Sequence, residues 1–390
     1  MTRLALLVLL AATEALAQSA VPPETAGGPS ACAEPVVLPA PSGPRGVGAA
    51  TYHWTDPARP EPRAPGAARE FMATVFYPAD AGSRPPRPYV PELAALRAAL
   101  RAGDGDGPRG LGRYASQFAC VHAAAVADAP LDDAGAPYPL VLVSPGGDMS
   151  RHWYTALAQD LASHGYVVAV LSHAHSGLDV FPLAGLVGKS PYYDEGDPAL
   201  DDALTDRLAE DARFVLDRLV ALGRGGPRFA GALDPDRVAI VGHSRGSRAV
   251  RRGCARGARF RACVVYDALG PAPERAAGLD VPELTVRAPW AETWGAARVD
   301  TLRAALARNR AVAFDAVVAG AGHFSFSDLA LVVPERFGAD VPARRALALT
   351  AALTRTFLRA VLSGGAPSET AALPPPDPGV TVTRFGPAPH

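Results

Sequence analysis

The stretch that decides the fold is Arg237-Val238-Ala239-Ile240-Val241-Gly242-His243-Ser244-Arg245-Gly246. Its first half is a continuous apolar run, which is typical of a central parallel strand covered on both faces. Its second half is a Gly-x-Ser-x-Gly motif, and residues 247–256 after it are compatible with a helix. In a strand–turn–helix of this kind, the two glycines relieve crowding in a tight turn that presents the serine hydroxyl above the sheet edge. The sequence therefore predicts Ser244 as an activated nucleophile.

Further β-rich runs lie on both sides of this strand. They are Val47–Trp54, Glu70–Tyr77, Tyr138–Ser144, Tyr166–Ser172, Ala262–Tyr266, Glu283–Val286 and Ala313–Val318. Apolar residues at helical spacing separate several of them, for instance between Leu200 and Leu219. Alternating strands and helices predict an α/β protein with a mostly parallel, doubly wound sheet of about eight strands, two antiparallel ones at the front. Residues 83–137 and 176–198 are too long for simple connections, so we expect lids or pocket walls there.

A serine hydroxyl becomes a good nucleophile only when a base takes its proton. After a nucleophile on such a turn, the partners should follow in the order serine, acid, histidine, with the histidine in a loop after the last strand. His323 follows the run Ala313–Val318 and is the only histidine after Ser244 apart from His390 near the chain end. The sequence therefore predicts His323 as the general base.

The base in turn needs a carboxylate that orients it. The acid is expected just after the strand that follows the nucleophile, and Asp267 ends the run Phe260–Tyr266. Asp280 and Asp300 compete for this role, but neither ends a strand. We therefore predict Asp267 as the acid.

Attack on a carbonyl produces an oxyanion, which backbone N–H groups stabilise. One donor should come from Arg245, the residue after the nucleophile. The other should come from the loop after the run Tyr138–Ser144, where the sequence reads Ser144-Pro145-Gly146-Gly147-Asp148. We place the second donor on Gly147. The alternative for this loop is an ordinary Pro-Gly turn.

These residues resemble the α/β-hydrolase fold, and within it the secreted, plasma-type platelet-activating-factor acetylhydrolases and their bacterial esterase and dienelactone-hydrolase-like relatives. The likeness covers most of residues 47–360. It is carried by Thr55–Pro60 with Val75–Pro78, by Tyr138–Ser144, by Leu161–Val168 and by the segment Phe260–Ala268. The resemblance implies a triad of Ser244, Asp267 and His323, and oxyanion donors on Gly147 and Arg245.

The chain departs from the pattern of these relatives at two places. Pro145 stands where the oxyanion loop usually has histidine, and Ser247 stands where the elbow usually continues with a second glycine. Gly146 and Gly147 keep their N–H groups, so backbone donors survive. The bulky Arg245 could narrow the pocket or attract an anionic head group. These departures bear on the substrate more than on the reaction.

From the motif and the resemblance we predict an exported serine carboxylic-ester hydrolase that works through an acyl-enzyme. The resemblance suggests phospholipids with a short or oxidised sn-2 acyl chain, or small soluble esters, as substrates. A polyester- or cutin-type hydrolase would have the same elbow and triad order. A hydrolase-like binding protein that has lost catalysis would lack a triad member, and none is missing.

The composition of the 390 residues agrees with an enzyme-sized globular protein. Hydrophobic residues make up 48% and charged residues 20%, and the net charge is −1. No basic surplus points to nucleic acid or to an anionic membrane. The partner expected is a small-molecule or lipid ester, with no transmembrane span; transient contact with a lipid surface stays open.

No cofactor and no metal are expected. The pair His173 and His175 resembles half of a zinc-hydrolase motif, but Gly177 and Leu178 stand where the remaining ligands would be. The two histidines are therefore interpreted as lining the pocket or as satisfied side chains at its wall.

The ends of the chain differ from its middle. Arg3, the apolar run Leu4–Ala12 and Ala15-Leu16-Ala17 form a signal peptide pattern, so we expect cleavage near Ala17 and export to the periplasm or medium. The resulting division is a signal peptide (1–17), a flexible Pro/Gly-rich linker (18–46), an α/β-hydrolase domain (47–363) and a disordered Pro-rich tail (364–390).

Four cysteines remain for an exported protein, and an even number permits disulfides. Cys254 and Cys263 are close enough in sequence to pair locally, which would leave Cys32 with Cys120. Buried, unpaired thiols are the alternative, and the sequence does not decide between them.

Overall fold

The secondary structure alternates between strands and helices along most of the chain. The computed structural model describes residues 34–101, 111–188, 197–257, 259–270, 272–290, 294–363 and 377–386. The strands are β1 (Val36–Val37), β2 (Gly46–Pro60), β3 (Ala68–Ala79), β4 (Val121–His122), β5 (Val126–Ala127), β6 (Tyr138–Ser144), β7 (Val167–His173), β8 (Asp179–Phe181), β9 (Gly185–Val187), β10 (Leu233–His243), β11 (Ala262–Tyr266), β12 (Glu283–Arg287), β13 (Ala313–Val318) and β14 (Val380–Phe385).

The helices fall mainly between the parallel strands. The α-helices are α1 (Leu93–Arg101), α2 (Thr155–Ser163), α3 (Pro198–Gly225), α4 (Arg245–Ala255), α5 (Ala272–Ala277), α7 (Ala296–Leu306), α8 (Leu329–Val332), α9 (Pro334–Phe337) and α10 (Ala343–Leu362). Short 3₁₀ turns are η2 (Gly112–Tyr114), η3 (Gln117–Cys120), η4 (Arg151–Tyr154) and η5 (His323–Phe326). No helix in the described part of the chain is long and apolar enough to cross a membrane.

The order of the strands fixes where the loops of the site meet. Within the described ranges, ten strands form one sheet in the order β14-β13-β12-β11-β10-β6-β7-β3-β2-β5. From β7 to β13 the neighbouring strands run parallel, and β2 and β3 pair antiparallel at the front, as predicted. Parallel strands end at the same edge of a sheet, where the crevice for a ligand forms in such folds. The loops after β6, β10, β11 and β13 therefore come together.

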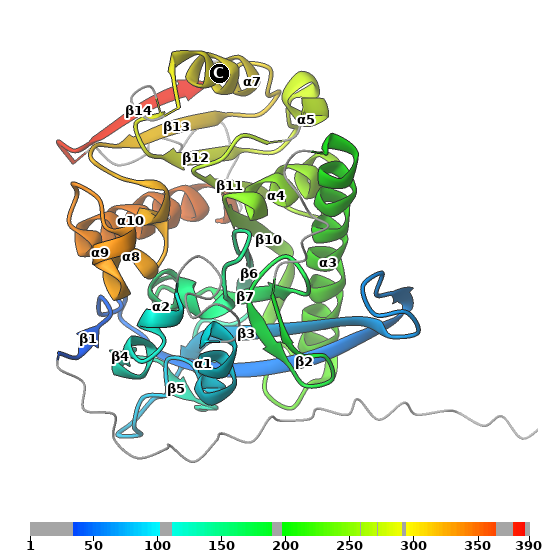
Figure 1. Cartoon of the computed structure of the whole chain (residues 1–390), viewed down its shortest axis with the longest axis vertical. Helices are drawn as coiled ribbons and strands as arrows, with labels where there is room; N and C mark the ends of the chain where they lie inside the picture. Colours follow the sequence, from blue (N-terminus) through cyan, green and yellow to red (C-terminus); the bar gives the residue numbers. More distant parts are fainter. Residues whose placement is uncertain are drawn as a thin grey trace, which may run out of the picture.

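Two apolar cores lie on the two faces of the sheet. Side chains alternate across a strand, so Leu140 and Ile240 pack with helices α3 and α4, whereas Val141 and Val241 belong to the core that contains α2 and α10. Figure 1 shows α3 on one side of the central strands and α10 on the other. Cover on both faces explains why the sequence runs of β6 and β10 are continuously apolar.

Two parts of the predicted organisation need correction. All eight predicted strands are present, but β5 and β14 extend the sheet. The tail predicted to be disordered contains β14, which pairs antiparallel with β13 along the whole run Ala313–Val318. The run Val380–Phe385 alternates β-branched apolar and polar residues, which is a strand pattern; the Pro-rich composition around it led to the prediction of a disordered tail.

The described end of the predicted linker also packs on the domain. Val36 and Val37 pair with β4, Leu38 is buried, and Ser42 donates a hydrogen bond to Asp160. The signal peptide pattern and most of the linker lie outside the described residues, so their predictions stand untested.

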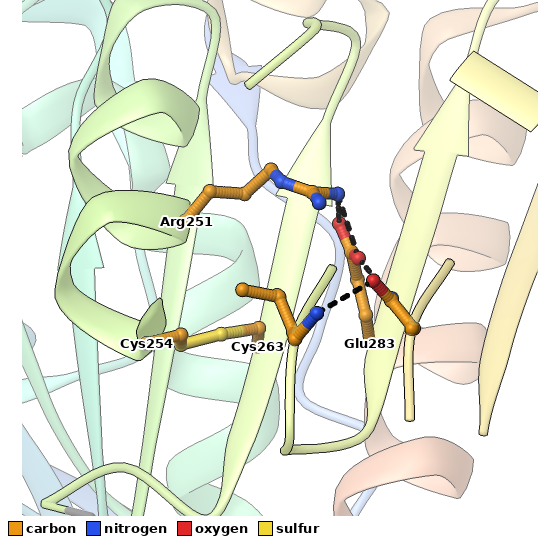
Figure 2. Close-up of a disulfide and its surroundings, with 6 residues drawn as sticks. Arg251, Cys254, Cys263 and Glu283 are labelled. Carbon is orange, nitrogen blue, oxygen red and sulfur yellow. Dashed lines mark hydrogen bonds and ion pairs between the residues drawn. A yellow bond between two sulfur atoms is a disulfide. The ribbon is translucent and has the colours of Figure 1, made fainter. Parts of the chain in front are cut away.

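A disulfide joins the helix after the nucleophile to the strand before the acid. Cys254 of α4 is bonded to Cys263 of β11, as Figure 2 shows, which realises the local pairing left open by the sequence. Beside it, the guanidinium of Arg251 donates to both carboxylate oxygens of Glu283, at 2.5 and 2.7 Å. Cys120 is disulfide-bonded as well; its expected partner Cys32 lies outside the described residues.

Candidate active site

Ser244 lies at the turn between β10 and α4 in an unusual backbone conformation. Its φ and ψ are 53° and −119°, a region that a residue with a side chain rarely adopts. The neighbouring glycines make the turn feasible. A Cβ on Gly242 would lie 2.6 Å from the carbonyl of Gly246, and a Cβ on Gly246 would lie 2.1 Å from the carbonyl oxygen of Ser144. The crowding inferred from the sequence is therefore present.

The structure brings the three predicted side chains into one hydrogen-bonded row. Ser244 Oγ lies 3.0 Å from His323 Nε2, and His323 Nδ1 lies 2.6 Å from Asp267 Oδ2. A carboxylate only accepts, so Nδ1 carries the proton of the neutral ring, and Nε2 is the acceptor for the serine hydroxyl. This arrangement can take a proton from Ser244 as its oxygen attacks an electrophile.

Asp267 is buried and held from two directions. Its Oδ1 accepts hydrogen bonds from the Ala288 N–H at 2.8 Å and from the Trp290 indole N–H at 2.6 Å. Burial acts to raise the pKa of Asp267, but the hydrogen bond and the charge of His323 outweigh it, so the pKa lies below its ordinary value. The carboxylate is therefore ionised at neutral pH. Asp280 and Asp300, the competing acids, are exposed and lie elsewhere.

Trp290 is a site residue that the sequence analysis missed. It lies 23 positions from Asp267, in the segment after β12, and its indole N–H points at the carboxylate only because β11 and β12 are parallel neighbours. No motif in the sequence marks it.

The predicted oxyanion loop packs against the nucleophile. A Cβ on Gly146 would lie 3.2 Å from Ser244 Cβ, and a Cβ on Gly147 would lie 3.8 Å from Arg245 Cβ. The N–H of Gly146 donates to the Tyr154 hydroxyl at 3.1 Å. Gly147 and Arg245, the two predicted donors, are thus brought side by side next to Ser244.

Tyr154 and His243 link this loop to the base. The Tyr154 hydroxyl lies 2.8 Å from His243 Nδ1, and His243 Nε2 lies 2.8 Å from the carbonyl oxygen of His323. Because a carbonyl only accepts, His243 Nε2 donates and Nδ1 of the neutral ring accepts from the tyrosine. The sequence places His243 only within the Gly-x-Ser-x-Gly motif, and no motif marks Tyr154. Their contact needs the loop after β6 and the loop after β10 to meet.

Arg245 does not present a lone cation to the site. Its guanidinium donates to Asp201 Oδ1 at 2.8 Å, and Arg248 pairs with the other oxygen of the same carboxylate. Asp201 therefore partly compensates the positive charge of Arg245, which was considered above for attracting an anionic head group. The same side chain lies beside Gly147, since a Cβ there would be 3.3 Å from Arg245 Nε.

His173 is a satisfied buried histidine. Its Nδ1 faces Asp211 at 3.0 Å and its Nε2 faces the Ser144 hydroxyl at 2.9 Å. His175 is more exposed and lies 3.7 Å from a Glu61 oxygen. Among the described residues, no group of three or more His, Cys, Asp or Glu side chains has an arrangement that could hold a metal ion. His173 thus lies next to Ser144 at the start of the predicted oxyanion loop, whereas His175 lies beside Glu61.

Comparison with known proteins agrees with this architecture. Residues 65–178, which run from β3 through the oxyanion loop to β7, match the family model described as platelet-activating factor acetylhydrolase, isoform II. A solved ferulic acid esterase from Streptomyces cinnamoneus is similar with a TM-score of 0.73 and 28% sequence identity, over 89% of this chain and 98% of that chain. The chain has the α/β-hydrolase fold. Its relationship is to esterases of that fold.

Curated relatives match a shorter segment of this chain. The platelet-activating factor acetylhydrolase of Cavia porcellus is 28% identical over 154 residues, and that of Bos taurus is 29% identical over 159 residues. A probable 1-alkyl-2-acetylglycerophosphocholine esterase of Arthroderma benhamiae is 28% identical over 129 residues. The first of these alignments spans 34% of this chain and 35% of the relative.

Proposed function

We propose that this protein is a serine carboxylic-ester hydrolase. The observation that carries the proposal is the row Ser244–His323–Asp267, with distances of 3.0 and 2.6 Å, at the carboxyl edge of the parallel sheet. The family model supports it from another part of the chain, because it covers residues 65–178 and none of these three side chains. Two separate parts of the chain thus favour the same chemistry.

In the proposed mechanism Ser244 Oγ attacks the ester carbonyl while His323 Nε2 accepts the hydroxyl proton. The backbone N–H groups of Gly147 and Arg245 stabilise the oxyanion, and Asp267 holds the imidazolium through Nδ1. His323 then gives the proton to the leaving alcohol, which departs and leaves an acyl-enzyme on Ser244. Water, deprotonated by the same histidine, hydrolyses the acyl-enzyme and returns the serine.

For the substrate we propose esters with a short acyl group, including phospholipids with a short or oxidised sn-2 chain. The relatives named as platelet-activating factor acetylhydrolases favour acetyl esters, and the neighbour named as a ferulic acid esterase favours esters of an aromatic acid. A panel of 4-nitrophenyl esters from acetate to palmitate, with 4-nitrophenyl ferulate and a cutin-type polyester, separates these classes. Turnover confined to the polymer would favour the alternative of a polyester hydrolase.

The first experiment is labelling of the purified protein with a fluorophosphonate probe. The probe phosphonylates a serine that a neighbouring base activates, so the wild-type protein should be labelled and Ser244→Ala should not. Ser363→Ala, an exposed serine after α10, is the matched control and should label normally. An unlabelled wild-type protein would sink the catalytic proposal and favour a hydrolase-like binding protein.

Export after cleavage near Ala17 belongs to the same proposal. The disulfide between Cys254 and Cys263 favours an oxidising compartment. Mass spectrometry of the exported protein should find Gln18 at the N-terminus; an N-terminus that retains residues 1–17 would refute cleavage.

A further inference from the structure

Three side chains at four-residue spacing follow β12, and only the first has been assigned a role above, through its hydrogen bond to Asp267. Trp290 holds Asp267, Trp294 lies beside His323 with 5.7 Å between ring centroids, and Arg298 follows in the first turn of α7. The Trp294 N–H donates to the Trp290 carbonyl at 2.7 Å, which ties the two tryptophans together. Trp294 is also one of the exposed large hydrophobic residues, with 40% of its surface accessible.

Arg298 is a cation without a carboxylate partner in the described part of the chain. Its guanidinium carbon lies 4.1 Å from the ring centroid of Trp294 and 5.3 Å from that of Trp290. Its Nε is buried and has no hydrogen-bond partner there. Other arginines near the site are compensated differently: Arg245 and Arg248 share Asp201, and Arg287 pairs with Asp315. Arg298 is therefore a candidate to bind an external anion.

The charges that act on Arg298 are one carboxylate, Asp267, and neighbouring arginines. Burial lowers the pKa of Arg298, the negative charge of Asp267 raises it, and the positive charge of Arg248 lowers it. Arg275, which donates to the Gly270 carbonyl, has its pKa lowered by burial and then by Arg248, Arg251 and Arg298. A substrate anion would relieve this repulsion, whereas a second cation would increase it.

The position of Arg298 also indicates which half of the ester it would contact. The proton on His323 Nε2 goes to the leaving oxygen, so the alcohol half must lie on the histidine side of Ser244. Gly147 and Arg245 define the opposite, oxyanion side. Because Trp294 contacts both His323 and Arg298, the two side chains lie where the alcohol half extends from the reacting centre.

We infer that Trp294 and Arg298 form a subsite for an anionic alcohol half of the ester, one that carries a carboxylate or a phosphate. This inference rests on the proposed esterase function and adds a substrate class to it. The indole face contacts the apolar part of the alcohol, and the planar guanidinium binds the anion, for which its paired N–H donors are suited.

The test compares 4-acetoxybenzoate with 4-acetoxybenzamide, two acetyl esters of similar shape whose alcohol halves are anionic and neutral. For Arg298→Gln, kcat/KM for the anionic ester should fall about tenfold while kcat/KM for the neutral ester stays within twofold. Arg298→Lys should retain most of the preference, because it keeps the charge. Arg303→Gln is the matched control, an exposed arginine on the same helix.

Added salt separates a charge effect from a change of shape. The preference of the wild type for the anionic ester should shrink between low and high NaCl concentration, and Arg298→Gln should show no such dependence. Inhibition of neutral-ester turnover by 4-hydroxybenzoate and by phenyl phosphate tells which anion is favoured.

The outcomes of these experiments distinguish a substrate subsite from a structural role of Arg298. An equal fall for both esters in Arg298→Gln would assign Arg298 a structural role in holding Trp294 and overturn the subsite. An unchanged ratio of the two esters would overturn it as well. If the wild type hydrolyses neither ester and no fluorophosphonate labels Ser244, the proposed function itself has failed, a result distinct from loss of the preference.

Discussion

At the scale of single residues, the site depends on how hydrogen-bond donors and acceptors are distributed around two rings. Asp267 can only accept from His323, and the His323 carbonyl can only accept from His243. Because of these two constraints, the neutral ring of His323 carries its proton on Nδ1 and the neutral ring of His243 carries its proton on Nε2. In the proposed mechanism, the proton of Ser244 therefore has one acceptor, His323 Nε2, and the ring need not change its tautomer first.

The first residue-scale prediction concerns the acid. Asp267→Asn should lower kcat by about 10³- to 10⁴-fold at neutral pH, because the amide no longer fixes the imidazole tautomer or stabilises the imidazolium. Asp300→Asn, at an exposed position on α7, should stay within twofold of the wild type. Steady-state turnover of 4-nitrophenyl acetate measures both. A crippled Asp300→Asn beside an active Asp267→Asn would reassign the acid.

At the scale of elements, Asp328 ties the segment after the base to helix α2. The carboxylate follows η5, is fully buried, and accepts from the N–H groups of Thr155 and Ala156 at the start of α2 and from the Tyr89 hydroxyl. Burial raises the pKa of Asp328 to about 7, against the lowering effect of the Tyr89 hydroxyl and the two N–H groups. The helix start and the segment after the base are thus joined through one titrating group.

This contact predicts a pH dependence of stability. Between the unfolded pKa of about 4 and the folded pKa of about 7, the folded protein binds a proton that the unfolded chain does not, so stability falls as pH rises through this window. Asp328→Asn resembles the protonated form. Between pH 5 and 8, the melting temperature of the wild type should fall by several degrees more than that of Asp328→Asn.

The control for this prediction is Asp340→Asn, an exposed carboxylate nearby in sequence. It should follow the wild-type pH profile. Differential scanning calorimetry at constant ionic strength measures all three proteins. Parallel profiles for Asp328→Asn and the wild type would show that Asp328 stays ionised in the folded state throughout.

At the scale of the whole molecule, the edge strand beside β13 is β14, which comes from the C-terminal part of the chain. Strand β14 pairs with β13, and the Ala319 N–H just after β13 donates to the Gly379 carbonyl at 2.8 Å. β13 leads directly into the loop that carries His323. The C-terminal strand therefore supports the loop of His323 from outside the predicted domain boundary.

Removal of residues 364–390 should lower the melting temperature by several degrees and increase aggregation, because β13 becomes an unpaired edge. Removal of residues 387–390 alone leaves β14 in place and is the control. Thermal unfolding followed by circular dichroism, with light scattering for aggregation, measures both. Equal melting temperatures for the two truncated proteins would mean that β14 contributes nothing to stability.

The sequence was sufficient for the elements whose signals are local. The continuous apolar runs of β6 and β10 indicate strands that are covered on both faces of the sheet. The glycines around Ser244 indicate a crowded turn. The chain order serine, acid, histidine then predicts Asp267 and His323, because the carboxyl ends of parallel strands meet at one edge. Each of these signals is contained within a few neighbouring residues or in their order along the chain.

The tertiary structure decided what depends on distant partners. The run Val380–Phe385 has a strand pattern of its own, but its pairing with β13 is decided by the fold, and Trp290 holds Asp267 only because β11 and β12 lie side by side. Likewise, Asp201 compensates Arg245, whereas Arg298 stacks on Trp294. A sequence lists the charges but not their pairing. Which cation stays available to a substrate is therefore decided by packing and could not be read from the sequence.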